Sequence, residues 1–186
     1  MRYAYGAMTK TNPFRSLRVR RSALVAAVAG SLLLLSCSDG SSAARGGGAA
    51  APAKADFRLK TLDGRSLGPK DFGGQVVVVD FWATWCMPCR LQAQILEPVY
   101  RDYKGRGVQF LAADVGEETE TVKKFLQEKP FPYPVILDPE QSVSNALGVL
   151  ALPTLMVIDK QGKVSYFQSG VADGDTVRQL IKNAGA

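Results

Sequence analysis

Histidine is absent from this chain of 186 residues, and cysteine occurs only three times. Without an imidazole ring the protein has no Ser-His or Cys-His nucleophile pair, no histidine-ligated haem and none of the ordinary zinc sites. The cysteines are Cys37, far upstream, and the pair Cys86 and Cys89. They are too few for a disulfide-stapled scaffold or for a four-thiolate metal site. Many nucleophilic and metal-dependent chemistries are thereby excluded.

Acidic residues are missing from the first 36 positions, which hold six of the 23 Lys and Arg residues. The formal net charge of +6 therefore belongs to this N-terminal segment. From Cys37 onward the remaining 17 basic residues balance the 17 Asp and Glu residues. A neutral domain does not present the basic surface that binds phosphate groups, so we expect no nucleic-acid partner.

The N-terminal segment has the layout of a secretory signal, with basic residues followed by an apolar run at 22–36. The run is shorter than the roughly 20 apolar residues that a comfortable membrane span needs. The sequence Leu34-Leu35-Ser36-Cys37 resembles the lipobox of bacterial lipoproteins, which implies a signal peptide over 1–36 and a lipid on Cys37. Residues 37–54, rich in Gly, Ser and Ala, would form a flexible tether. The alternatives are an uncleaved anchor helix, or a plain signal that leaves Cys37 as a spare thiol.

Residues 55–186 alternate between strand and helix patterns, which predicts one α/β domain around a mixed sheet. The valine run at 76–79 is typical of a strand that is covered on both faces. Asp63-Gly64 predicts the turn of an N-terminal hairpin. The expected strands cover 57–62, 75–82, 108–115, 133–137, 154–158 and 164–168. The expected helices cover 88–103, 117–128, 140–147 and 173–183, the last with Asp173 as its N-terminal cap. In the first helix the apolar residues Leu91, Ile95, Val99 and Tyr103 recur every four positions.

Cys86 and Cys89 are separated by two residues and lie at the start of the first expected helix. At a helix N-terminus the unpaired N–H groups and the dipole favour a thiolate, which predicts Cys86 as a nucleophile towards disulfides. Cys89, one turn along the same face, would resolve the mixed disulfide. Half of a zinc ribbon has the same spacing, but no second cysteine pair follows. A structural disulfide is the stronger alternative.

Asp80 directly follows the valine run and is expected to be buried. Burial raises the pKa of a carboxyl group, so Asp80 could exchange protons with Cys89 as the disulfide opens and closes. The alternative is an exposed or hydrogen-bonded aspartate at the end of a strand.

The segment 79–90, VDFWATWCMPCR, resembles the active-site segment of the thioredoxin superfamily. Segments 57–64 and 134–138, and the helix inserted between positions 115 and 130, are similar to its membrane-anchored TlpA/ResA branch. Segment 148–154, GVLALPT, is similar to the family's cis-proline loop. The resemblance implies a thioredoxin fold, a three-layer α/β/α sandwich around a mixed sheet, with an N-terminal β-hairpin and a central TlpA/ResA-type insert. It also implies a thiol-disulfide oxidoreductase that uses its own redox-active disulfide and needs no other cofactor and no metal.

The resemblance further implies roles for single residues. Pro153 would be cis and lie against the cysteine pair, leaving neighbouring backbone free for a substrate segment; an ordinary trans proline is the alternative. Leu152 would face the dithiol, and Trp85 would shield the nucleophile unless it is only a packing residue. Met87 and Pro88, between the cysteines, complete the expected substrate-binding residues.

The chain departs from the family pattern near the cysteines. Met87 stands where the ResA type has Glu, and Gln92 and Gln94 occupy the usual places of Glu and Pro in the helix. These replacements put three family features in doubt: the influence of an acidic side chain on the cysteine pair at Met87, a proline kink of the helix at Gln94, and recognition of a partner through Glu at Gln92. A peroxidase is not expected, because peroxiredoxins carry Thr or Ser and Pro where this chain has Ala83 and Val79.

The expected function is reduction of disulfides in exported proteins, with re-reduction by a membrane electron donor. Apo-cytochrome c is the substrate class that the resemblance suggests first. The protein would remain on the periplasmic or extracytoplasmic face of the cell envelope, on the membrane, through its lipid anchor. An oxidase is the rival within the same class. A copper(I)-handling module, since two thiolates suit Cu(I), and a redox-inactive binding module are the alternatives from other classes.

Overall fold

The computed structural model of the chain describes residues 52–186. Cys37, the expected signal peptide at 1–36 and the tether up to residue 51 lie outside the described residues, so the expectations for them stay predictions. Within the part that is described, no helix is both long and apolar enough to cross a membrane.

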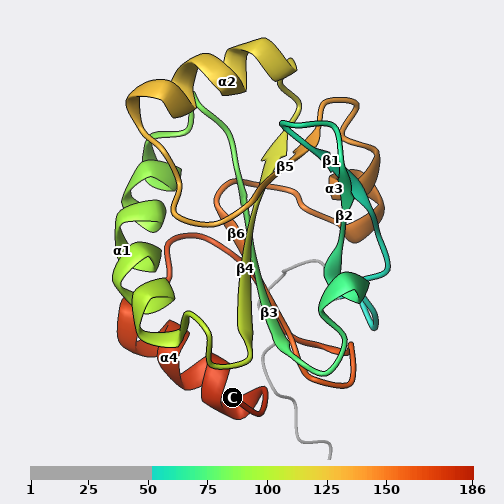
Figure 1. Cartoon of the computed structure of the whole chain (residues 1–186), viewed down its shortest axis with the longest axis vertical. Helices are drawn as coiled ribbons and strands as arrows, with labels where there is room; N and C mark the ends of the chain where they lie inside the picture. Colours follow the sequence, from blue (N-terminus) through green and yellow to red (C-terminus); the bar gives the residue numbers. More distant parts are fainter. Residues whose placement is uncertain (1–51) are drawn as a thin grey trace, which may run out of the picture. The chain divides into compact units, whose positions relative to one another are not determined.

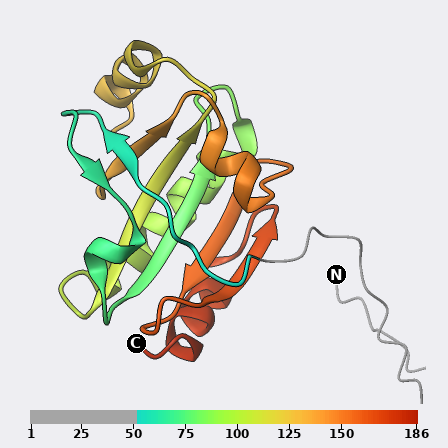
Figure 2. The ribbon, with the colours of Figure 1, turned by 90° about the vertical axis from the view of Figure 1, so that its right-hand side faces the viewer.

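Seven strands form one mixed sheet in the order β2-β1-β5-β4-β3-β6-β7 (Figure 1). Their bounds are β1 Leu59–Thr61, β2 Ser66–Leu67, β3 Val76–Trp82, β4 Val108–Val115, β5 Val135–Asp138, β6 Thr154–Ile158 and β7 Val164–Ser169. Strands β3, β4 and β5 run parallel, and the other pairs are antiparallel. Figure 2 shows the N-terminal hairpin at one edge of the sheet and β7 at the other. All six expected strands are present, and the first of them forms the expected hairpin with β2.

Strand β3 lies in the middle of the sheet and carries the active-site segment at its end. It pairs with β4 along its whole length and with β6 on its other side. All seven of its residues are buried, as the valine run predicts for a strand covered on both faces. The strand therefore delivers the loop that follows Trp82 to one end of the sheet from a rigid base.

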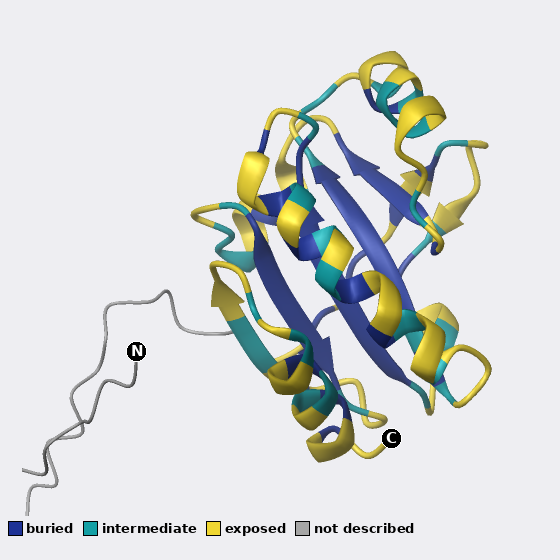
Figure 3. Cartoon of the chain, turned by 90° about the vertical axis from the view of Figure 1, so that its left-hand side faces the viewer, coloured by how far each residue is buried: buried dark blue, intermediate teal, exposed yellow. Residues whose placement is uncertain are grey.

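Helices cover both faces of the sheet and complete three layers. Their bounds are α1 Met87–Tyr103, α2 Thr119–Glu128, α3 Ser142–Leu147 and α4 Gly174–Asn183, with a short 3₁₀ helix, η1, at Pro69–Phe72. Residues of α1, α2 and α4 join one core cluster, whereas η1 and α3 pack on a second cluster on the opposite face. Figure 3 shows the buried strands behind the half-exposed α1. The expected three-layer α/β/α thioredoxin fold, with α2 as the insert between β4 and β5, is confirmed.

The buried face of α1 follows the spacing of four apolar residues only in part, because Val99 is buried and Ile95 and Tyr103 are half-buried. The structure buries Cys89, Gln92, Leu96 and Val99, whereas Leu91 is 51% exposed. The expected spacing of four residues drifts around a helix of 3.6 residues per turn, so it does not track a single face over four turns. Cys89 therefore starts the buried face, which then continues through Gln92.

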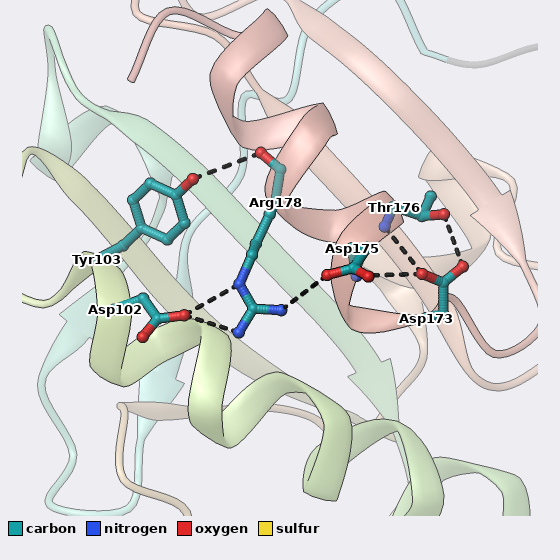
Figure 4. A network of polar contacts seen from close by, with 6 residues as sticks. All are labelled: Asp102, Tyr103, Asp173, Asp175, Thr176 and Arg178. Carbon is teal, nitrogen blue, oxygen red and sulfur yellow. Dashed lines mark hydrogen bonds and ion pairs between the residues drawn. The ribbon is translucent and has the colours of Figure 1, made fainter.

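Helix α4 is held to the end of α1 by the polar contacts of Figure 4. Asp173 caps α4, as expected, because its side chain accepts hydrogen bonds from the backbone N–H groups of Asp175 and Thr176. Arg178 donates from Nε and Nη2 to the Asp102 carboxylate at the end of α1, at 3.0 and 2.7 Å. These contacts fix the helix that closes the chain against the helix that carries the cysteines.

Candidate redox-active site

Cys86 and Cys89 form a disulfide at the start of α1. Cys86 is the N-cap of the helix, and its Sγ accepts the backbone N–H of Cys89 at 3.2 Å. After reduction the same N–H group and the helix dipole favour a thiolate on Cys86. The two cysteines are almost equally buried, at 3% and 2% exposure, so exposure does not distinguish them. What distinguishes them is the position of Cys86 at the helix terminus.

The chain turns sharply between β3 and α1 to place this pair. The backbone N–H of Cys86 donates to the carbonyl of Ala83 at 3.2 Å, which closes the turn. Pro88 lies in the first turn of the helix, where its missing N–H costs no helical hydrogen bond.

Two large apolar side chains flank Cys86 in the sequence, and a third lies in the loop before Pro153; all three are exposed. Trp85 and Met87 are 68% and 66% exposed, and Leu150, in the loop before Pro153, is 80% exposed. Trp85 is therefore not a core residue, which removes the packing alternative considered for it. Exposed apolar groups near one site are suited to contact with another molecule.

The Leu152-Pro153 peptide bond is cis, as expected. Leu152 is half-buried and packs against both core clusters. Thr154, which follows Pro153, begins β6, the strand beside β3. The roles of Pro153 and Leu152 towards a substrate stay predictions.

Asp80 is buried, with 1% exposure, and neither of its carboxyl oxygens has a hydrogen-bond partner. Burial raises the pKa of this carboxyl well above its usual range. Alternation along β3 places Asp80 on the face of Val78 and Trp82, which belong to the core cluster that contains Cys89. The expected burial of Asp80 is confirmed, and its part in proton transfer stays a prediction.

Thr84, two residues before Cys86, is held on both sides by charged side chains. Glu117, after β4, accepts the Thr84 N–H at 2.5 Å and the Thr84 hydroxyl at 2.6 Å. Arg90 Nη2, on α1, donates to the Thr84 carbonyl at 2.9 Å. These contacts fix the backbone that leads into the nucleophile.

Glu117 is not among the site residues that the sequence motifs predict. A signal was available, because neighbouring parallel strands end at the same edge of a sheet. An acidic residue shortly after β4 can therefore reach the loop that follows β3.

Gln92, whose place is usually taken by Glu in the family, is fully buried. Its Nε2 donates to the Ala172 carbonyl at 3.3 Å, and its Oε1 accepts the Ala172 N–H at 2.7 Å. This amide satisfies the backbone of the loop before α4, which a carboxylate with only acceptor atoms could not do in both directions. Gln92 thus links α1, close to the disulfide, to the β7–α4 loop.

A cavity of about 590 Å³ lies beside the disulfide, between α1 and the insert that contains α2. Its wall includes Trp82, Met87, Cys89, Arg90, Phe125 and Phe131. The Arg90 guanidinium lies over the Phe125 ring at 5.5 Å. Among residues 52–186, no group of three or more His, Cys, Asp and Glu side chains is arranged to hold a metal ion.

A thioredoxin fold with a disulfide at the start of its first long helix defines the class of thiol-disulfide oxidoreductases, and this protein is one of them. Residues 48–167 match the AhpC/TSA family, and the chain belongs to that family.

Similar proteins and solved structures carry names of the same class. The chain is 36% identical to the thiol-disulfide oxidoreductase ResA of Geobacillus thermodenitrificans over 128 residues, which are 69% of this chain and 74% of the relative. A solved structure from Chlorobium tepidum, assigned as a thiol:disulfide interchange protein DsbE, is 33% identical with a TM-score of 0.66 and covers 73% of this chain and 97% of its own. A second thiol:disulfide interchange protein from Chlorobium tepidum TLS is 29% identical with a TM-score of 0.63, over 73% of this chain and 97% of its own. The expected resemblance to the ResA branch is confirmed.

Proposed function

We propose that this protein reduces disulfides of exported proteins on the extracytoplasmic side of a membrane, with Cys86 as nucleophile and Cys89 as resolving thiol. The observation that carries the proposal is the position of Cys86 as the N-cap of α1, where its sulfur already accepts the N–H of Cys89. Catalysis by thiolates needs such a site, because the thiolate and not the thiol attacks a disulfide.

The reaction proceeds by two exchanges that balance in electrons and protons. The Cys86 thiolate attacks one sulfur of a substrate disulfide, forms a mixed disulfide and releases the other substrate sulfur as a thiolate, which takes up a proton. Cys89, once deprotonated, attacks Cys86, and the second substrate sulfur leaves and takes up a proton. Two electrons and two protons pass to the substrate, and the Cys86–Cys89 disulfide forms.

Asp80 is proposed to take the Cys89 proton in the second exchange. A carboxyl group whose pKa is raised by burial lies nearer to a thiol in acidity than an exposed one does. Its place on the face of β3 that joins the cluster of Cys89 supports this role.

Substrate contact is proposed for the surface around the disulfide. Trp85 and Met87 supply exposed apolar area, Pro88 is exposed between the cysteines, and Leu152-Pro153 lies in the loop before β6. An extended peptide with a cysteine can lie on such a surface through apolar and backbone contacts.

The finer assignment follows from the resemblance to the TlpA/ResA branch and from the lipobox-like sequence before Cys37. We propose apo-cytochrome c as the first substrate class, a membrane protein as electron donor and a lipid on Cys37 as anchor. Other exported cysteine proteins come second.

Trapping of the mixed disulfide tests the roles of the two cysteines. The Cys89→Ser variant should hold disulfide-bearing substrate proteins in covalent complexes that thiol reductants release, because nothing resolves the bond to Cys86. The matched variant Cys86→Ser should hold none, since the nucleophile is gone. Equal trapping by both variants would reverse or remove the assigned roles.

The reduction potential of the Cys86–Cys89 pair tests the direction of electron flow. A value near that of thioredoxin, about −270 mV, supports a reductant, and a value near about −120 mV marks an oxidant. Absence of any two-electron transition would contradict the reductase proposal and favour a thiol module that binds copper(I).

A further inference from the structure

Asp114, at the carboxyl end of β4, is a buried carboxyl group that the reaction above does not use. Its exposure is 0%, and neither of its oxygens accepts a hydrogen bond from an N–H or hydroxyl group. Among the described residues no cation forms an ion pair with it. A buried carboxylate without a compensating partner is costly, so its presence next to an active-site loop needs a physical explanation.

Asp114 lies within reach of the contacts that hold the loop before Cys86. It stands opposite Trp82 in the pairing of β3 with β4, so it lies at the end of the sheet where this loop begins. Three residues later the chain reaches Glu117, whose two oxygens bind Thr84. The neighbouring Glu117 carboxyl acts on Asp114 and raises its pKa. Two carboxyl groups can share a hydrogen bond only when one of them carries a proton.

We propose that Asp114 is a positioning residue for the dithiol: while protonated it donates a hydrogen bond to the Glu117 carboxylate, and its ionisation loosens the hold of Glu117 on Thr84. The inference rests on the proposed function for its consequence in catalysis, but the contact itself does not depend on it. The loop would then be ordered when Asp114 is neutral and less ordered when Asp114 is charged.

The surroundings of Asp114 agree with a protonated group at neutral pH. Burial, above all, and then the neighbouring Glu117 carboxyl raise the pKa of Asp114 to about 8, and Asp138 on β5 adds a smaller rise. The backbone N–H of Glu117 acts in the opposite sense. Arg90 lies on the other side of Thr84, where it binds the carbonyl.

The absence of histidine makes this titration easy to observe. In the disulfide form the cysteine pair does not titrate, and the chain has no imidazole. An inflection near pH 8 in the chemical shift of the Thr84 amide then has few other sources: the terminal amine, an unmodified Cys37 thiol, and Asp80, whose pKa is also raised by burial. The variant Asp80→Asn distinguishes a titration of Asp80 from a titration of Asp114, because it removes the Asp80 carboxyl.

The test is a pH titration of the Thr84 amide by NMR in the oxidised full chain, held in detergent micelles and labelled with ¹⁵N-threonine. The peak is assigned by its loss in Thr84→Ser. In the wild type it should shift with an inflection near pH 8. The inflection should vanish in Asp114→Asn, whose amide donates to Glu117 at every pH, and it should remain in Asp80→Asn.

A second measurement gives the consequence for the dithiol, as the rate at which reduced Cys86 reacts with dithiodipyridine. The rate in Asp114→Asn divided by the rate in the wild type should be near one at pH 6.5 and rise to about threefold or more at pH 9. In the wild type at pH 9 the charged Asp114 would leave Cys86 less well placed, and misplacement of a reacting group slows attack. A flat wild-type titration, or an inflection that persists in Asp114→Asn, would overturn the proposal. Since the NMR titration uses the disulfide form, it can succeed even if the proposed reduction of exported proteins fails.

Discussion

At the scale of single residues, the unusual feature of this protein is that two carboxyl groups, Asp80 and Asp114, are buried on the same side of the sheet and accept no hydrogen bond from an N–H or hydroxyl group. For both, burial is the first cause of a raised pKa. A carboxyl whose pKa is higher in the folded than in the unfolded state binds its proton more tightly in the folded state. Such a group destabilises the fold increasingly as the pH rises from the unfolded pKa, about 3.9 for Asp, towards the folded one.

Replacement of Asp80 by Asn tests this linkage. We expect Asp80→Asn to be more stable than the wild type at pH 7, by about 1–3 kcal/mol, since an amide avoids burying a charge. Below about pH 3.5 the difference should disappear, because Asp is then neutral in both states. The measurement is urea unfolding of the oxidised protein at several pH values.

The same variant separates stability from catalysis. If Asp80 accepts the Cys89 proton, Asp80→Asn should slow resolution of the mixed disulfide about 10²-fold or more at neutral pH while it leaves the first attack by Cys86 nearly unchanged. A variant that is stabilised and still resolves the mixed disulfide at the wild-type rate would assign Asp80 no part in proton transfer.

At the scale of secondary-structure elements, the closing helix α4 depends on a cap and on its contacts with α1 (Figure 4). Asp173 accepts from two backbone N–H groups and from the Thr176 hydroxyl. Asp173→Ala leaves these donors without their partner and should lower the melting temperature by about 3–6 °C.

A nearby acid provides the control for the cap. Asp175→Ala removes a side chain that is 99% exposed and contacts Arg178 only at 3.5 Å. We expect a change of less than about 2 °C, because exposed ion pairs contribute little. Equal losses in both variants would mean that charge near the helix start, and not the cap, stabilises α4.

At the scale of the whole molecule, the testable expectation concerns the membrane. Cys37→Ser in the full chain should abolish labelling by radioactive fatty acid and release the protein from the membrane fraction, because the remaining apolar run is shorter than a comfortable span. Cys86→Ser, the matched control, should keep both the label and the location. Retention of Cys37→Ser in the membrane would favour the uncleaved anchor helix.

Much of the fold could be predicted from the sequence, because the strongest signals are local. The valine run, the turn at Asp63-Gly64 and the cap at Asp173 each act within a few residues, and the structure contains the strand, hairpin and helix that they predict. The apolar residues that recur every four positions in α1 mark its buried face only in part, since packing against the sheet decides which side of a long amphipathic helix faces inward.

The sequence by itself determined the dithiol and its chemistry. A cysteine pair separated by two residues, between a buried strand and a helix, brings two sulfurs within bonding distance through local geometry alone. The tertiary structure decided what surrounds that pair. Glu117 reaches Thr84 across 33 positions and Gln92 reaches Ala172 across 80, and the burial of Asp114 follows from the layers that cover β4. Contacts of this range depend on how parallel strands end together and how helices cover them, which no local pattern of residues encodes.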